Sequence, residues 1–127
     1  MTHNEPTRTF ALVHNIPSPY RLHLFRVLEQ RLRPRGHRLF VHFMAQTHID
    51  RPHWRADPAE LNFPHRFHFD VGPRRGQKEW HLNPGLVATL LRSRPDVLMV
   101  GGPWDTLTTA GLTVLAPALA PRRIAWI

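Results

Sequence analysis

Apolar residues along the chain form short continuous runs that alternate with segments of helical periodicity. Residues 9–14 and 37–45 are two such runs, and each predicts a buried strand. The segment between them has helical spacing and the length that a crossover between parallel strands requires. Residues 9–45 therefore predict a β–α–β unit.

The helix of this unit carries sequence signals at both ends. Ser18 is a favourable N-cap, and Pro19 suits the first helical position, where no N–H is needed. Pro34 and Gly36 end the helical pattern. The predicted apolar stripe of the helix consists of Tyr20, Leu24, Val27, Leu28 and Leu32, and is widened by Leu22 and Phe25.

The rest of the chain continues the alternation after a long break. Residues 46–64 show no period and predict a loop, of a length that is often functional. The elements predicted beyond it are a strand at 66–71, a break at 72–76, a helix from Asn83 to Arg94, a strand at 96–100, a helix capped by Asp105 that stops at Pro117, and a strand at 122–127. This order favours an α/β fold, with a mostly parallel sheet and helices on both faces.

The last run of the sequence, residues 124–127, is apolar, and its pattern predicts a central strand. Domain termini are usually exposed and loosely held. We therefore expect residues 1–127 to be a single domain whose sheet is incomplete at the C-terminus, a truncated front part of a longer protein.

Composition narrows the class of protein. A chain of 127 residues with 42% hydrophobic and 20% charged residues is typical of one globular domain. It contains no cysteine, which excludes a disulfide scaffold and a thiolate zinc site. The N-terminal residues lack the apolar stretch of a signal peptide. No apolar run approaches the roughly 18 residues of a membrane span.

The charge is strongly basic and suggests an alternative function. The 17 basic residues outnumber the 9 acidic ones, the net charge is +8, and Lys78 is the sole lysine. Such charge attracts nucleic acid or an anionic membrane surface, so a stand-alone basic binding module is the alternative. The flanking pattern of an RNA-recognition motif is missing, and we expect no specific nucleic acid. The densest cluster is Arg31, Arg33, Arg35 and Arg38, at a helix end where positive charge is favourable anyway.

Two segments fall where open parallel sheets bind ligands, at the carboxyl ends of strands. The first is residues 15–21, where a helix N-terminus suits a phosphate or an oxygen-rich ligand. Its candidate substrate-binding residues are Asn15, Ser18, Tyr20 and Arg21. For Ser18 the simpler interpretation is that it only starts the helix, whereas Asn15 and Arg21 have weaker structural explanations.

The second segment is residues 101–105. Gly101 and Gly102 permit a sharp turn or close approach of a ligand. Trp104 suits stacking on a ligand, and Asp105 is a candidate base or hydroxyl acceptor. A tight turn followed by a helix cap is an equally good interpretation. The sequence contains neither G-x-G-x-x-G nor a P-loop, so a dinucleotide site has no support.

Ten histidines raise the question of a metal site. His65 and His68 are the closest pair, but residues three apart on a strand point to opposite faces. His37 and His42 fail for the same reason. We therefore predict solvated surface histidines and no metal.

Together these segments resemble the N-terminal domain of a GT-B glycosyltransferase of the family 4 type. The resemblance covers nearly the whole chain from Phe10 onward. Ile16-Pro-Ser-Pro19 stands where many relatives have a glycine-rich loop. The matching segments are Leu12-Val-His-Asn-Ile-Pro-Ser-Pro-Tyr-Arg21 with Leu-His-Leu-Phe25, then Arg51-Pro-His-Trp54, Arg94-Pro-Asp-Val-Leu-Met-Val-Gly-Gly102 and Ile124-Ala-Trp126.

The resemblance implies a Rossmann-like acceptor domain of a bacterial, cytoplasmic, retaining enzyme that builds polysaccharide and is either free in the cytoplasm or peripheral to the inner membrane face. Its donor is a nucleotide-sugar, its acceptor is a glycan or lipid-linked glycan, and it uses no metal or other cofactor. Residues 15–21 and 101–105 match the segments of that family that face the catalytic cleft, with Asp105 as the catalytic candidate. The partner is a C-terminal GT-B domain that these residues lack, so we expect them to be inactive alone.

Overall fold

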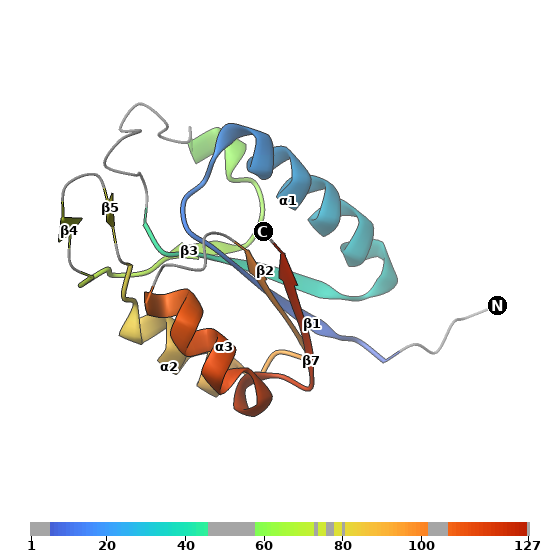
Figure 1. The fold of residues 1–127 in the computed structure, drawn as a ribbon. Coiled ribbons are helices and arrows are strands. Elements are labelled where there is room, and N and C mark those ends of the chain that lie inside the picture. The colour runs from blue at the N-terminus through green and yellow to red at the C-terminus, as the bar shows by residue number, and fades with distance from the viewer. Residues whose placement is uncertain are drawn as a thin grey trace.

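In the part of the chain that the structure describes, a five-stranded sheet is flanked by three α-helices (Figure 1). The computed structural model describes residues 6–45, 58–72, 74–75, 78–79, 81–101 and 107–126. The strands are β1 (Thr9–His14), β2 (Arg38–Phe43), β3 (His65–Phe67), β4 (Arg74–Arg75), β5 (Lys78–Glu79), β6 (Val97–Gly101) and β7 (Arg122–Trp126). The helices are α1 (Pro19–Leu32), α2 (Pro84–Ser93) and α3 (Leu107–Leu119), with short 3-10 turns η1 (Arg33–Arg35) and η2 (Pro58–Glu60).

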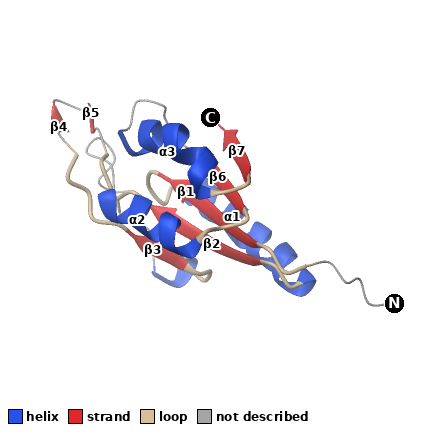
Figure 2. Ribbon diagram, turned by 90° about the horizontal axis from the view of Figure 1, so that it is seen from below, coloured by secondary structure: helices blue, strands red, loops and turns tan. Residues whose placement is uncertain are grey.

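The main sheet has the order β3-β2-β1-β6-β7, and all of its neighbouring strands are parallel. Helix α1 covers one face, and α2 and α3 cover the other, as the two views show (Figures 1 and 2). Strands β4 and β5 form a separate antiparallel hairpin. The predicted α/β class is confirmed, because a parallel sheet between two helical layers is a Rossmann-like arrangement.

Two apolar clusters hold these layers together. Under α1, Phe25 and Leu22 pack with Phe43 of β2 in a cluster that is almost fully buried. On the opposite face, Leu86 of α2 and Leu112 of α3 pack against the sheet in the second cluster. Since each strand alternates its side chains between the faces, β1 contributes to both clusters.

The β–α–β prediction for residues 9–45 is confirmed, but α1 is rotated from the predicted stripe. Leu22 and Phe25, expected to widen that stripe, are its most buried residues at 1% and 0% exposed. Tyr20 is 65% exposed and Leu24 is 39% exposed. The reason is that α1 docks with the line of Leu22 and Phe25 onto Phe43 of β2, which the helical period alone does not reveal.

Two element boundaries differ from prediction. Strand β3 spans His65–Phe67 instead of 66–71, because it pairs only with Val41–Phe43 of β2. Helix α3 passes through Pro117 and ends at Leu119. A proline so near the last turn removes one helical hydrogen bond and leaves the earlier turns unaffected. The small β4–β5 hairpin was not predicted.

Within the described part of the chain, no helix has both the length and the hydrophobicity of a membrane span. The predicted loop 46–64 contains η2 near its end, and residues 46–57 lie outside the described ranges.

Candidate functional site

The carboxyl ends of β1 and β6 meet at one edge of the sheet and bring together three groups. His14 ends β1, Gly101 ends β6, and Arg21 lies in the first turn of α1. The pKa of His14 is lowered to about 4, first by burial and then by the nearby charge of Arg21, although a hydrogen bond to the Gly101 backbone acts in the opposite direction. His14 is therefore neutral near pH 7 beside a permanent cation.

His14 is held by contacts on two sides. Its ring packs edge-on against Phe25, with ring centroids 5.7 Å apart. Its backbone carbonyl accepts a hydrogen bond from the Met44 N–H at 3.0 Å, which carries the β1–β2 pairing beyond the end of β2. Sequence reasoning did not select His14. The available signal was a polar residue that ends an otherwise apolar strand.

The start of α1 differs from the predicted cradle of free N–H groups. The N–H groups of Arg21 and Leu22 both donate to the Ser18 carbonyl, at 3.0 and 3.1 Å, and Pro19 has no N–H. Ser18 occupies the N-cap position, yet its side chain makes no capping hydrogen bond. Its hydroxyl is buried and has no hydrogen-bond partner in the described structure. Attraction for an anion at this turn therefore comes mainly from the Arg21 side chain.

Tyr20 and Arg21 form the outer part of this edge. The Arg21 guanidinium lies 5.6 Å from the centre of the Tyr20 ring, a cation–π distance. Tyr20 is mostly exposed, whereas Arg21 and Asn15 are half-buried. The structure thus places Asn15 and Ser18 on the connection after β1 and Tyr20 and Arg21 in the first turn of α1, and the charge of Arg21 acts on His14, which contacts Gly101.

The other predicted site residues cannot be placed in this group. Gly102, Trp104 and Asp105 lie outside the described residues, as does the matching segment 51–54. Their contribution to the edge remains the sequence-based prediction.

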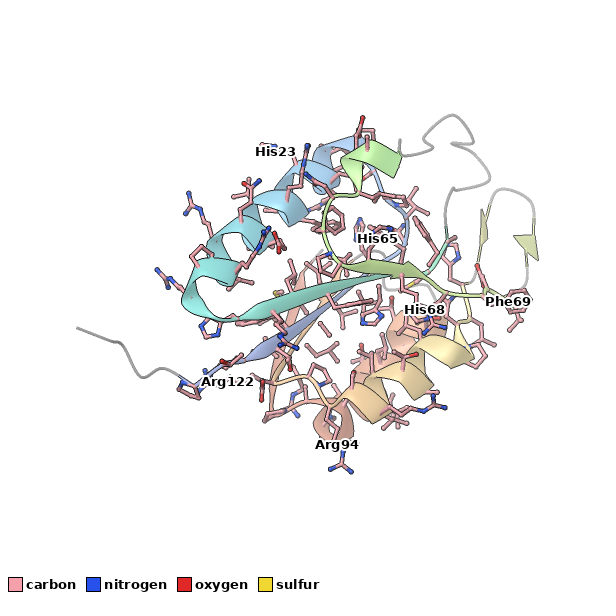
Figure 3. All side chains as sticks on the ribbon, turned by 180° about the vertical axis from the view of Figure 1, so that it is seen from behind. His23, His65, His68, Phe69, Arg94 and Arg122 are labelled. Atoms are coloured by element: carbon pink, nitrogen blue, oxygen red, sulfur yellow. The ribbon has the colours of Figure 1, made fainter. Side chains whose placement is uncertain are left out.

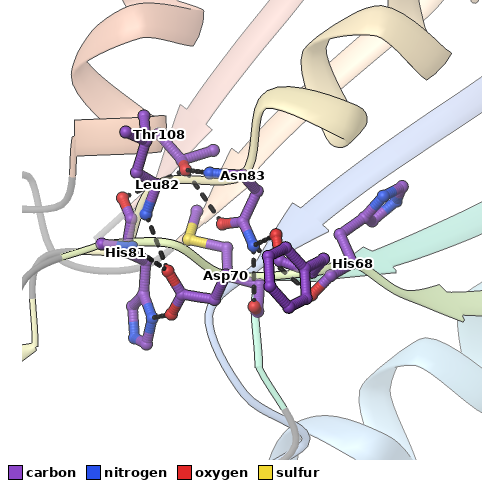
Figure 4. Close-up of polar contacts among 9 residues, drawn as sticks. His68, Asp70, His81, Leu82, Asn83 and Thr108 are labelled. Atoms are coloured by element: carbon purple, nitrogen blue, oxygen red, sulfur yellow. Dashed lines mark hydrogen bonds and ion pairs between the residues drawn. The ribbon is translucent and has the colours of Figure 1, made fainter.

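An Asp–His pair lies beyond the end of β3, near the same edge (Figure 4). Asp70 Oδ2 contacts His81 Nδ1 at 2.5 Å, and Asp70 Oδ1 accepts hydrogen bonds from the N–H groups of Gly72 and Leu82. Burial raises the pKa of Asp70, but the hydrogen bonds from His81, Leu82 and Gly72 together lower it below its usual value. The ionised Asp70 accepts a hydrogen bond from the Nδ1–H of His81, and this contact fixes the orientation of the ring.

Asn83 connects the segments around this pair. Its amide donates to the Met44 carbonyl at 2.9 Å and to the Phe69 carbonyl at 3.0 Å. Its Oδ1 lies 2.9 Å from the Thr108 hydroxyl, which also lies 3.1 Å from the His81 carbonyl. The single hydroxyl proton of Thr108 serves one of these two acceptors at a time. Asn83 is fully buried, so it links the segment after β2, the segment after β3 and the start of α3.

The prediction of solvated surface histidines was wrong for four of them. His14, His42, His68 and His81 are each less than 8% exposed, whereas His23 lies on the outer side of α1 (Figure 3). Burial, followed by the charge of Arg66, lowers the pKa of His68 to about 4. Burial, His68 and Arg66, in that order, lower the pKa of His42 to about 3.

His42 and His68 form a buried pair. Their Nδ1 and Nε2 atoms are 2.9 Å apart, so one neutral ring donates its proton to the other. His65, considered as a partner of His68, instead contacts the Phe63 carbonyl through Nδ1 at 2.8 Å. Among the residues that the structure describes, no three His, Cys, Asp or Glu side chains converge as a metal site would require.

Comparison of the chain with protein-family models, with curated proteins and with solved structures finds no match.

Proposed function

We propose that the edge formed by His14, Arg21 and Gly101 is the acceptor side of a glycosyltransferase, where sugar moves from a nucleotide-sugar to a glycan or lipid-linked acceptor. The observation that carries this proposal is the juxtaposition of a neutral buried histidine and an arginine at the carboxyl ends of two parallel strands. Ligands of open α/β sheets bind at this edge. The resemblance of the chain to family 4 enzymes supports the same function.

Each group has a chemical role in the proposal. The Arg21 guanidinium attracts the negative charge of a donor phosphate. Neutral His14 offers hydrogen bonding without adding a second cation beside Arg21. From the sequence alone, Trp104 stacks on a sugar face and Asp105 orients an acceptor hydroxyl.

Titration of the ¹⁵N-labelled chain with UDP-glucose, GDP-mannose and glucose 1-phosphate tests the site by NMR. We expect the amide signals of Asn15, Arg21 and Gly101 to shift with at least one ligand. Arg21→Ala should weaken binding about tenfold, as expected for a lost charge-assisted contact. Arg31→Ala, at the other end of α1, should have little effect. Unchanged spectra with all three ligands, or shifts confined to other surfaces, would overturn the proposal.

Asp105 is tested by transfer of sugar in the enzyme that also contains the C-terminal GT-B domain, because residues 1–127 are expected to be inactive alone. Asp105→Asn keeps the shape of the side chain and removes its charge. It should lower the transfer rate on the order of a hundredfold, as loss of a positioned acid–base group does, with little change in melting temperature. Normal transfer by this variant would reduce Asp105 to a helix cap.

A specific observation also favours the alternative function, binding to an anionic membrane surface. Residues 19–35 contain five arginines and one acid, Glu29, which is paired with Arg33. Exposed Tyr20 and Leu24 lie on the same helix. Apolar groups beside arginines favour a lipid surface over nucleic acid.

Co-sedimentation with vesicles distinguishes this alternative. Vesicles with anionic phosphatidylglycerol should bind the chain, and binding should fall with salt, because surface charge is screened. The double variant Arg31→Gln/Arg35→Gln should bind less than Arg122→Gln/Arg123→Gln, which lies on β7. Equal binding to neutral phosphatidylcholine vesicles would contradict the electrostatic mechanism.

A further inference from the structure

A pocket of about 370 Å³ lies at the amino ends of β1 and β2, opposite the edge that carries the candidate site. Thr9 and Arg38 begin these strands, and the last turn of α2 closes one side through Ser93. Small-molecule sites have volumes of about 300–1,000 Å³. The pocket is thus large enough for a small ligand.

The walls of the pocket are largely apolar. The apolar lining residues are Phe10, Ala11, Leu39, Phe40, Pro64 and Pro95. Phe40 remains 38% exposed although its strand lies inside the sheet. Its ring packs on His42, with centroids 4.8 Å apart, which leaves the rest of the ring facing the pocket. An apolar segment of a ligand would remove this surface from water.

The hydroxyl groups of the pocket are already used within the protein. Thr9 Oγ1 lies 3.2 Å from Asp96 Oδ2. Thr89 Oγ1 donates to the Gly85 carbonyl at 2.7 Å, and Ser93 Oγ is 3.5 Å from the Leu90 carbonyl. These hydroxyls therefore already have hydrogen-bond partners and do not require a polar ligand.

Among the described residues, the charged groups of the pocket leave one cation without a partner. Glu29 is paired with Arg33. His37 Nδ1 accepts a hydrogen bond from the Arg8 N–H, and His42 contacts His68. Of the ionisable residues that line the pocket, Arg38 alone has no side-chain hydrogen bond or ion pair to a described residue. The pocket thus combines apolar walls with one available positive charge.

We propose that this pocket binds a small amphiphilic anion, a short aliphatic chain that ends in one carboxylate. The chain covers Phe40 and the apolar walls, and the carboxylate pairs with the Arg38 guanidinium, which presents the donors for a bidentate contact. The site is at the opposite edge from His14 and Arg21, so this proposal and the proposed function succeed or fail separately.

Calorimetric titration with octanoate, octanol and octylamine tests the proposal, since these probes share the chain and differ in charge. We expect octanoate to bind at least tenfold more tightly than octanol, and octylamine to bind most weakly. Arg38→Gln should bring octanoate to the affinity of octanol. Arg35→Gln, an exposed arginine on η1 that does not line the pocket, should keep the difference.

A second variant and a map of the site complete the experiment. Phe40→Ala should weaken octanoate and octanol alike, because it removes the apolar wall while Arg38 remains. In ¹⁵N NMR spectra, octanoate should shift the amides of Thr9, Phe40 and Thr89. Equal affinity for octanoate and octanol would overturn the charge assignment. Failure of octanoate to bind, or shifts centred on Arg21 and Gly101, would overturn the pocket assignment.

Discussion

Acidification should destabilise the protein through its buried histidines. His14, His42 and His68 have pKa values of about 4, 3 and 4, against 6.5 for an unperturbed side chain. As the pH falls below 6.5, the unfolded chain takes up protons that the folded protein does not. The free energy of unfolding is therefore fully retained above about pH 6.5 and decreases from there toward pH 4.

The size of the effect follows from the pKa difference. A histidine that stays neutral in the folded state but takes up a proton in the unfolded chain lowers the free energy of unfolding by about 2 kcal/mol between pH 6.5 and pH 5. This value follows because one pKa unit corresponds to about 1.36 kcal/mol. His14 contributes one such increment, and the hydrogen-bonded His42–His68 pair contributes at least one more. A loss of about 4 kcal/mol by pH 5 is a large part of the roughly 5–15 kcal/mol by which domains are stable.

Urea unfolding at pH 7 and pH 5, followed by circular dichroism, measures this loss. His14→Gln should reduce the difference between the two pH values by about 2 kcal/mol, because it removes one titrating group. The matched control is His23→Gln on the exposed side of α1, which should leave the difference unchanged. Equal stability at the two pH values, or equal effects of the two variants, would refute the reasoning.

Three further predictions concern stability in urea. Asn83→Ala should reduce the free energy of unfolding by about 2–4 kcal/mol, since it leaves buried carbonyls without donors. The matched control Asn62→Ala, at an exposed position after η2, should change it by almost nothing. Gly36→Ala should reduce the free energy of unfolding by about 1 kcal/mol, because Gly36 has a φ of +80°, which an alanine adopts only with strain. Gly111→Ala in α3 should instead stabilise the protein by up to about 1 kcal/mol, since the added Cβ meets no atom within 4 Å and alanine favours the helix. Phe25→Ala should cost about 3–5 kcal/mol through a core cavity. These assignments would be contradicted if Asn62→Ala destabilised the protein more than Asn83→Ala, or Gly111→Ala more than Gly36→Ala. A loss below about 1 kcal/mol for Phe25→Ala would contradict them as well.

The sequence by itself determined the β1–α1–β2 unit, the parallel sheet class and the positions of α2 and β6. The signals for these elements are local. Pro19 suits a first helical turn, Gly36 adopts the left-handed conformation that ends η1, and runs such as residues 97–100 suit a strand buried between two layers. Such signals act within a few residues of the chain, so they can be read without the fold.

The tertiary structure decided which side chains meet. It turned Tyr20 and Leu24 of α1 outward, and it joined His42 to His68, 26 residues away. Asn83 occupies the N-cap position of α2, but its side chain makes no capping hydrogen bond and instead binds carbonyls on distant segments. These contacts depend on how the helices dock on the sheet and on the register of neighbouring strands, which no local pattern specifies. The same dependence explains why His14, an unremarked end of an apolar strand, lies beside Arg21 and Gly101 at the candidate site.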